Sequence, residues 1–266
     1  MTTQDTSFPK TAVHNRADRH VVVVADRFAR FADGQDVLTL SDLLMLVSSG
    51  AAAHGGGVWA VHIGQGIEES DCRVIESACG LNGSADVRVA DRDSLLRPRV
   101  TPRTVHKTRQ ENVLLANVRN LSNDHCAADL CIHRDNELVL DHHTAEHVQG
   151  MVIIEAIRQI CIAQFETGYR LEMPQFDYAG IWKRINLSFQ DFLFALPATI
   201  VAEISSADLS RPAKLNFRAR ASIWQNGCDV ASAELEYCMM EQARFRMIEG
   251  RRSGYATRTF LARFTN

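Results

Sequence analysis

The residues of this chain that are best suited to chemistry lie close together past the middle of the sequence. Glu155, Arg158 and Gln159 are spaced by three and four positions, which places a carboxylate, a guanidinium and an amide on one face of a helix. Two interpretations stay open. The group is either an exposed Glu–Arg pair of small energetic effect, which Glu166 favours because it continues the same face, or a partly buried functional site.

A second polar group precedes that helix. Asp141, His142 and His143 are followed by Glu146 and His147. Imidazoles and carboxylates at this density could ligate a metal, but their spacing matches no zinc pattern such as HExxH, so we expect no metal site. A polar turn at the mouth of the helix is the simpler interpretation, in which His142 is available to carry a proton.

These groups are positioned by one long helix expected over residues 147–168. Its apolar residues lie on most sides: Val152, Ile153, Ile154, Ile157, Ile160, Cys161, Ile162 and Phe165. A helix that is apolar all round must be surrounded by other elements. The segments that follow it can do this only by curling around it as an antiparallel sheet. The sequence therefore predicts a hot-dog fold.

Strict alternation of apolar residues identifies the strands of that sheet. The residues expected to share inward faces are Ile185, Leu187 and Phe189; Leu215, Phe217, Ala219, Ala221 and Ile223; and Ala231, Ala233, Leu235 and Tyr237. Asn226-Gly227 predicts a tight hairpin turn between the last two of these strands.

The N-terminal part has a different pattern. Apolar strands and helices alternate, with Thr39 or Ser41 as the N-cap of the first helix, and this predicts a small α/β unit with parallel pairing. Its glycine-rich stretches match no complete phosphate loop, so its role stays unassigned. The whole chain is thus expected to be of the α+β class. Its expected parts are a disordered leader at 1–19, the α/β unit at 20–98, the hot-dog domain at 103–240 and a basic extension at 241–266.

Composition narrows the class of protein. The net charge of −3 argues against bulk binding to nucleic acid, and no apolar run approaches the ~20 residues that span a bilayer. The first residues contain no apolar core typical of a signal peptide. The 7 cysteines form no zinc or redox motif, which is typical of a reducing compartment. We therefore expect a cytoplasmic protein.

The segment LDHHTAEHVQGMVIIEAIRQ resembles the characteristic motif of the A-factor (γ-butyrolactone) biosynthesis hot-dog family. That motif runs Asp-His, a spacer, an acid followed by His-Val, then Gly-Met, aliphatic residues and Glu-Ala-x-Arg-Gln. The residues that fall on it are Asp141, His142, Glu146, His147, Val148, Gly150, Met151, Glu155, Ala156, Arg158 and Gln159. VHKTRQENVLLANV, at 105–118, resembles the opening of the family. The resemblance covers about half of the chain.

This resemblance implies a reaction. A β-ketoacyl group would pass from acyl carrier protein, or from acyl-CoA, to the hydroxyl of a small phosphorylated acceptor such as dihydroxyacetone phosphate, in butyrolactone or butenolide signal synthesis. Glu155 could serve as the base and Arg158 could bind the phosphate or the developing oxyanion, with His142 as a third catalytic candidate. Direct transfer needs no cofactor. The expected substrate-binding residues are Asp141, Gly150, whose neighbouring amides could hold the thioester oxygen, Met151 and Gln159.

Two rival functions use the same residues. One is a thioester hydrolase or dehydratase, and the other is a non-catalytic sensor of acyl ligands. Relatives in the resembling family carry two hot-dog repeats, whereas this chain has one, so we expect a homodimer. Six arginines against two glutamates after Met240 form either a solvated extension or a docking surface for an acidic carrier protein.

Overall fold

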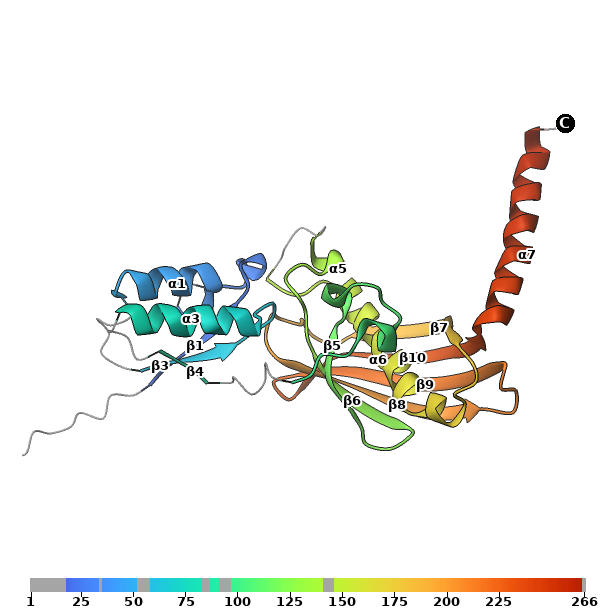
Figure 1. Ribbon diagram of the computed structural model, residues 1–266, viewed down its shortest axis with the longest axis horizontal. Coiled ribbons are helices and arrows are strands. Elements are labelled where there is room, and N and C mark those ends of the chain that lie inside the picture. The colour runs from blue at the N-terminus through green and yellow to red at the C-terminus, as the bar shows by residue number, and fades with distance from the viewer. Residues whose placement is uncertain are drawn as a thin grey trace, which may run out of the picture.

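The computed structural model describes residues 18–33, 35–51, 58–82, 87–90, 97–140 and 146–264. They form a small parallel sheet and a larger antiparallel sheet, each with its own hydrophobic core. Figure 1 shows the small sheet with its helices at one end of the molecule and the larger sheet, which curves around a long helix, at the other. The α+β class and the hot-dog fold predicted from the sequence are confirmed.

The N-terminal sheet has the order β2-β1-β3-β4, and all its pairs are parallel. Its strands are β1 (Arg19–Val24), β2 (Val37–Thr39), β3 (Trp59–Ile63) and β4 (Val87–Val89). Helices α1 (Leu40–Ser48) and α3 (Glu69–Asn82) cover the same face of the sheet (Figure 1). Thr39 is the N-cap of α1, because its side chain accepts a hydrogen bond from the amide of Asp42.

The hot-dog sheet has the order β5-β6-β8-β9-β10-β7, and every pair is antiparallel. Its strands are β5 (Leu115–Asn120), β6 (His125–Leu130), β7 (Tyr178–Phe189), β8 (Ala198–Asp208), β9 (Lys214–Gln225) and β10 (Cys228–Glu241). Helix α6 (Gly150–Thr167) supplies eleven buried residues to the core, as expected of a helix that is apolar all round. Short helical turns η2 (Pro102–Val105), η3 (Gln110–Asn112), α5 (Glu137–Leu140) and η4 (Tyr169–Glu172) connect these elements.

The predicted inward faces of β9 and β10 form the inner wall of the curved sheet. Every residue predicted to point inward on these two strands is buried. Asn226 and Gly227 both have positive φ, which a two-residue hairpin turn of this type requires. The alternation in the sequence therefore identified both strands and their register.

Strand β7 lies at one edge of the sheet. Ile185, Leu187 and Phe189 pair with Leu235, Ala233 and Ala231, so they share the inward face as predicted. Nevertheless, Ile185 is 37% exposed and Phe189 is 54% exposed, because no strand lies beyond β7 and α6 does not cover this margin. The apolar face of this 12-residue edge strand is therefore partly open to solvent toward its C-terminal end.

After β10 the chain continues as α7 (Gln242–Leu261) and the short turn η5 (Ala262–Phe264). None of the residues of α7 is buried, and Figure 1 shows the helix standing away from the sheet. No helix in the described part of the chain is long and apolar enough to cross a membrane.

Candidate functional site

Four polar side chains meet on one side of α6. The guanidinium of Arg158 donates from Nε and Nη2 to the two oxygens of Glu155, both at 2.8 Å. Lys107 approaches Glu155 Oε1 with its ammonium nitrogen at 2.8 Å, and Gln159 Nε2 donates to the same oxygen at 2.9 Å. The Glu155 side chain is only 15% exposed. The carboxylate thus interacts with donors from three side chains and is largely shielded from solvent.

This cluster also connects α6 to the chain that precedes β5. Arg158 Nη2 donates to the carbonyl of Val105 at 3.1 Å. Gln159, which is completely buried, accepts from the amide of Leu114 and donates to the carbonyl of Asn112, both at 2.8 Å. The Glu155–Arg158–Gln159 group therefore holds the segment of residues 105–114 against the helix.

The surroundings of Glu155 decide its charge. Burial raises the pKa of this carboxyl, but the hydrogen bonds from Arg158 and Lys107 and the charge of Arg158 lower it by more. The net pKa lies below the ordinary value, so Glu155 is ionised at neutral pH. A carboxylate stabilised in this way is a weak proton acceptor.

A cavity of about 430 Å³ opens at the start of α6. Its lining residues are His147, Val148, Gly150, Ile153, Phe189, Gln190, Asp191, Phe192 and Leu193. A Cβ on Gly150 would lie 3.0 Å from Cζ of Phe189, so the glycine allows the aromatic ring to close over the helix start. The first amides of a helix have no partner within the helix, and they carry the positive end of its dipole. This cavity therefore combines apolar walls with the positive end of a helix dipole.

The cavity and the Glu155 cluster lie on different sides of α6. At 3.6 residues per turn, Glu155 is rotated by about 140° from Gly150 and by about 160° from Ile153. Met151 lies one turn before Glu155 on the same side, is 54% exposed and does not line the cavity. The residues expected to form one site are thus divided between two places.

The structure brings together Glu155, Arg158 and Gln159, and it separates them from Gly150. Asp141 and His142 lie outside the described residues, so their predicted roles stay predictions. Within the described part of the chain, no group of three or more potential ligands is arranged to hold a metal ion.

One cavity residue has a role that the sequence did not suggest. From the sequence, His147 was interpreted as part of a polar turn and as a residue of the family motif, but no role was assigned to it. In the structure its ring lies 4.8 Å from that of Phe192 across the mouth of the cavity, and its backbone bridges to Phe194. The imidazole places two ring nitrogens, each able to donate or accept a hydrogen bond, in the lining of this cavity. The position of His147 in the motif, just before the start of the helix, was the sequence feature that could have pointed to it.

The thiols near α6 are unsuited to nucleophilic attack. Burial raises the pKa of Cys161 to about 12 and that of Cys126 to about 11. Both stay protonated at neutral pH, and the thiolate is the reactive form. Neither thiol is therefore a candidate nucleophile.

Comparison with known proteins gives a family match. The family model described as the A-factor biosynthesis hotdog domain matches residues 90–241, more than half of the chain. No curated protein matches the chain significantly.

Solved structures resemble the chain at low identity. The dehydratase heterocomplex ApeI:P from Xenorhabdus doucetiae is 18% identical, covering 53% of this chain and 91% of that chain with a TM-score of 0.44. A putative thioesterase from Ralstonia eutropha is 16% identical over 46% of this chain and 83% of that chain, with a TM-score of 0.33. Thioesterase superfamily member 2 from Mus musculus is 12% identical over 46% and 79%, with a TM-score of 0.33.

Proposed function

Because the chain belongs to the A-factor biosynthesis hotdog domain family, we propose that the protein is an acyltransferase. It moves a β-ketoacyl group from a thioester of acyl carrier protein or coenzyme A to the hydroxyl of a small phosphorylated acceptor such as dihydroxyacetone phosphate. The product would be the ester precursor of a butyrolactone- or butenolide-type signal. The observation that carries the proposal is the cavity at the start of α6.

The cavity suits the acyl end of a thioester. Its volume of about 430 Å³ lies within the roughly 300–1,000 Å³ typical of small-molecule sites. Val148, Ile153 and Phe189 offer apolar contacts to an acyl chain. The amides at the start of α6 would hydrogen-bond the thioester oxygen and stabilise its negative charge as the acceptor adds.

Transfer requires a proton carrier. The acceptor oxygen forms a bond to the thioester carbon and gives up its proton, then the carbon–sulfur bond breaks and the departing sulfur takes a proton. We assign both proton steps to His147, which lines the cavity. The assignment of Glu155 as base stays a prediction, but its lowered pKa and its side of the helix favour a positioning role.

We further propose that the active form is a homodimer joined along β7. The edge amides and carbonyls of β7 can extend the sheet into a second chain. Phe189 belongs both to this edge and to the cavity wall, so a partner chain would cover an open side of the site. Solution scattering should give a dimeric mass, and Ile185→Lys should yield monomers. Leu121→Lys, at a more exposed apolar residue just after β5 in the chain, should leave the dimer intact.

Mass spectrometry of products tests the function. The protein is incubated with a β-ketoacyl thioester with and without dihydroxyacetone phosphate. An ester of the acceptor is expected. Free acid in both reactions would indicate a hydrolase. In a separate incubation with a β-hydroxyacyl thioester, loss of water would indicate a dehydratase. Tight binding of the thioester without any product would indicate a sensor, and each of these three results would contradict acyl transfer.

A further inference from the structure

The α/β unit is held firmly against the hot-dog domain by Gln65, which follows β3. Its side-chain amide donates to the carbonyls of Leu130 at 3.2 Å and Leu196 at 3.0 Å, and its Oε1 accepts from the amide of Ile132 at 2.7 Å. The backbone amide of Gln65 donates to the carbonyl of Ala195 at 2.9 Å. Every polar atom of this buried side chain thus has a partner in the other unit.

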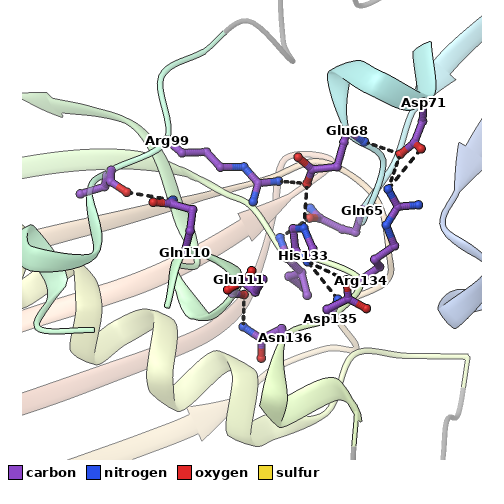
Figure 2. Close-up of polar contacts among 12 residues, drawn as sticks. Gln65, Glu68, Asp71, Arg99, Gln110, Glu111, His133, Arg134, Asp135 and Asn136 are labelled. Carbon is purple, nitrogen blue, oxygen red and sulfur yellow. Dashed lines mark hydrogen bonds and ion pairs between the residues drawn. The ribbon is translucent and has the colours of Figure 1, made fainter. Parts of the chain in front are cut away.

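Ion pairs continue this contact, as Figure 2 shows. Arg134 Nη2 lies 3.1 and 3.0 Å from the two oxygens of Asp71. Glu68 pairs with Arg99 and lies 3.4 Å from Nε2 of His133. The two acids belong to the start of the α3 region, whereas Arg99, His133 and Arg134 belong to the hot-dog side. The two units are therefore joined by a buried hydrogen-bonded side chain and by ion pairs.

The same contact fixes the loop that follows β1. Phe28, in the short helix η1 (Asp26–Phe28), packs against the cores of both units. Phe31 stacks on Phe194 of the hot-dog domain with the ring centroids 5.4 Å apart. Arg30 lies between these two anchors.

Arg30 lines a second cavity next to the proposed acyl site. This open cavity of about 620 Å³ is formed by Arg30, Glu146, His147, Phe192 and Phe194. It shares His147 and Phe192 with the 430 Å³ cavity at the start of α6. A substrate that extends from the acyl site past His147 and Phe192 would reach the cavity that Arg30 lines.

The guanidinium of Arg30 is available to a ligand. Its side chain is exposed, and among the residues that the structure describes no carboxylate forms an ion pair with it, although Glu146 lines the same cavity. Guanidinium groups bind phosphate through two parallel hydrogen bonds. The repulsion expected from Glu146 would direct an anion toward the Arg30 end of the cavity.

We propose that Arg30 binds the phosphate of a substrate, so that the α/β unit completes the site of the hot-dog domain. The ligand class is a phosphate ester, carried either by the pantetheine arm of the donor or by the acceptor. The inference rests on the proposed function for the place of the acyl group. It gives a role to a unit that lies almost entirely outside the family match at 90–241.

Calorimetry with the full chain tests this without turnover. The probes are coenzyme A against pantetheine for the donor, and dihydroxyacetone phosphate against dihydroxyacetone for the acceptor. Arg30→Ala should weaken one phosphorylated probe by about 10-fold or more, as expected for a lost charge-assisted bond, and leave its phosphate-free counterpart unchanged. The pair of probes whose phosphorylated member loses affinity shows whether the phosphate comes from the donor or from the acceptor. Arg73→Ala, on the surface of α3, is the matched control and should change neither pair.

Two results would overturn the inference. One is equal affinity of Arg30→Ala and the unmodified protein for both phosphorylated probes, and the other is no measurable binding of either probe to the unmodified protein. The proposed function fails separately. If the protein binds phosphate through Arg30 but forms no ester, this inference stands and the proposed acyl transfer is wrong. If Arg30→Ala changes neither phosphate binding nor ester formation, acyl transfer stands and this inference is wrong.

Discussion

On one side of α6, Glu155 is enclosed by donors from Arg158, Lys107 and Gln159, and the group holds the preceding segment in place. On the other side, His147 and the start of the helix border a cavity with apolar walls. Polar groups that are fully paired stabilise a structure, whereas polar groups that face a cavity can bind and react. The comparison therefore supports our proposal that the reaction takes place at the cavity and that the Glu155 cluster stabilises the fold.

The largest expected effect is on the cavity side. His147→Asn keeps a polar side chain but removes the proton carrier, so turnover should fall by about 100-fold or more, while the melting temperature stays within a degree or two. Steady-state kinetics and thermal unfolding measure the two effects. His125→Asn, at an exposed histidine on β6, should leave both unchanged. Normal turnover by His147→Asn would show that His147 is not the proton carrier.

In the Glu155 cluster, Glu155→Gln should mainly lower the stability of the fold. It leaves Lys107 and Arg158 without their shared anion, and we expect a loss of about 1–3 kcal/mol in the free energy of unfolding. Glu166→Gln is the matched control, since Glu166 accepts from His106 and Arg170 in the same manner farther along the helix. Similar effects of both changes on turnover are expected. A fall of about 100-fold for Glu155→Gln alone would establish Glu155 as the base.

The contribution of Glu155 should depend on pH in a defined direction. The pKa of its carboxyl is lower in the folded than in the unfolded chain. Its stabilisation is therefore complete above the unfolded value and is lost as the pH falls through the lower folded value. Urea unfolding should show a difference in the free energy of unfolding between Glu155→Gln and the unmodified protein at pH 7. This difference should shrink below a pH of about 4. A gap that grows on acidification would contradict the ion-pair account.

Arg158→Lys should have a smaller effect, and it distinguishes a structural role of the guanidinium from a role in binding phosphate. Lysine keeps the charge but cannot make both bonds to Glu155 and the bond to the Val105 carbonyl, so about 1–2 kcal/mol of stability should be lost. Arg170→Lys is a comparable change in the neighbouring network. If the Michaelis constant rises for the phosphorylated acceptor and not for the donor, Arg158 contacts that phosphate, as the sequence suggested.

The smallest effect should come from α7. This helix belongs neither to the cavity nor to the Glu155 cluster, and its arginines could attract an acidic carrier protein. Deletion of residues 243–266 should therefore slow the reaction only with carrier-bound acyl groups. The slowing should be a few-fold and should fade above ~0.5 M salt, because complementary charge mainly speeds encounter. Equal slowing with a small thioester analogue, or loss of the dimer, would make α7 structural.

Local patterns made much of the fold predictable. Ala231 and Leu235 on β10, and the turn at Asn226-Gly227, follow from alternation and from glycine chemistry within a few residues. The exposure of Phe189 was not predictable, because it depends on β7 being the last strand in the sheet. Strand β2, with 3 residues, is too short to leave a pattern.

The site was predictable only in part. The spacing of Glu155, Arg158 and Gln159 correctly placed them together on one helix face. No spacing rule connects Glu155 to Lys107, which comes from a segment far earlier in the chain. The place of Arg30 beside the cavity depends on how two units pack, which no local pattern encodes.

A crystal structure with a non-hydrolysable analogue of a β-ketoacyl pantetheine thioester tests the comparison most directly. The account predicts the analogue's carbonyl oxygen at the first amides of α6, its acyl chain against Phe189 and Val148, and His147 within reach of the atom that replaces sulfur. An analogue bound against Lys107 and Glu155, with the cavity at Gly150 empty, would contradict it.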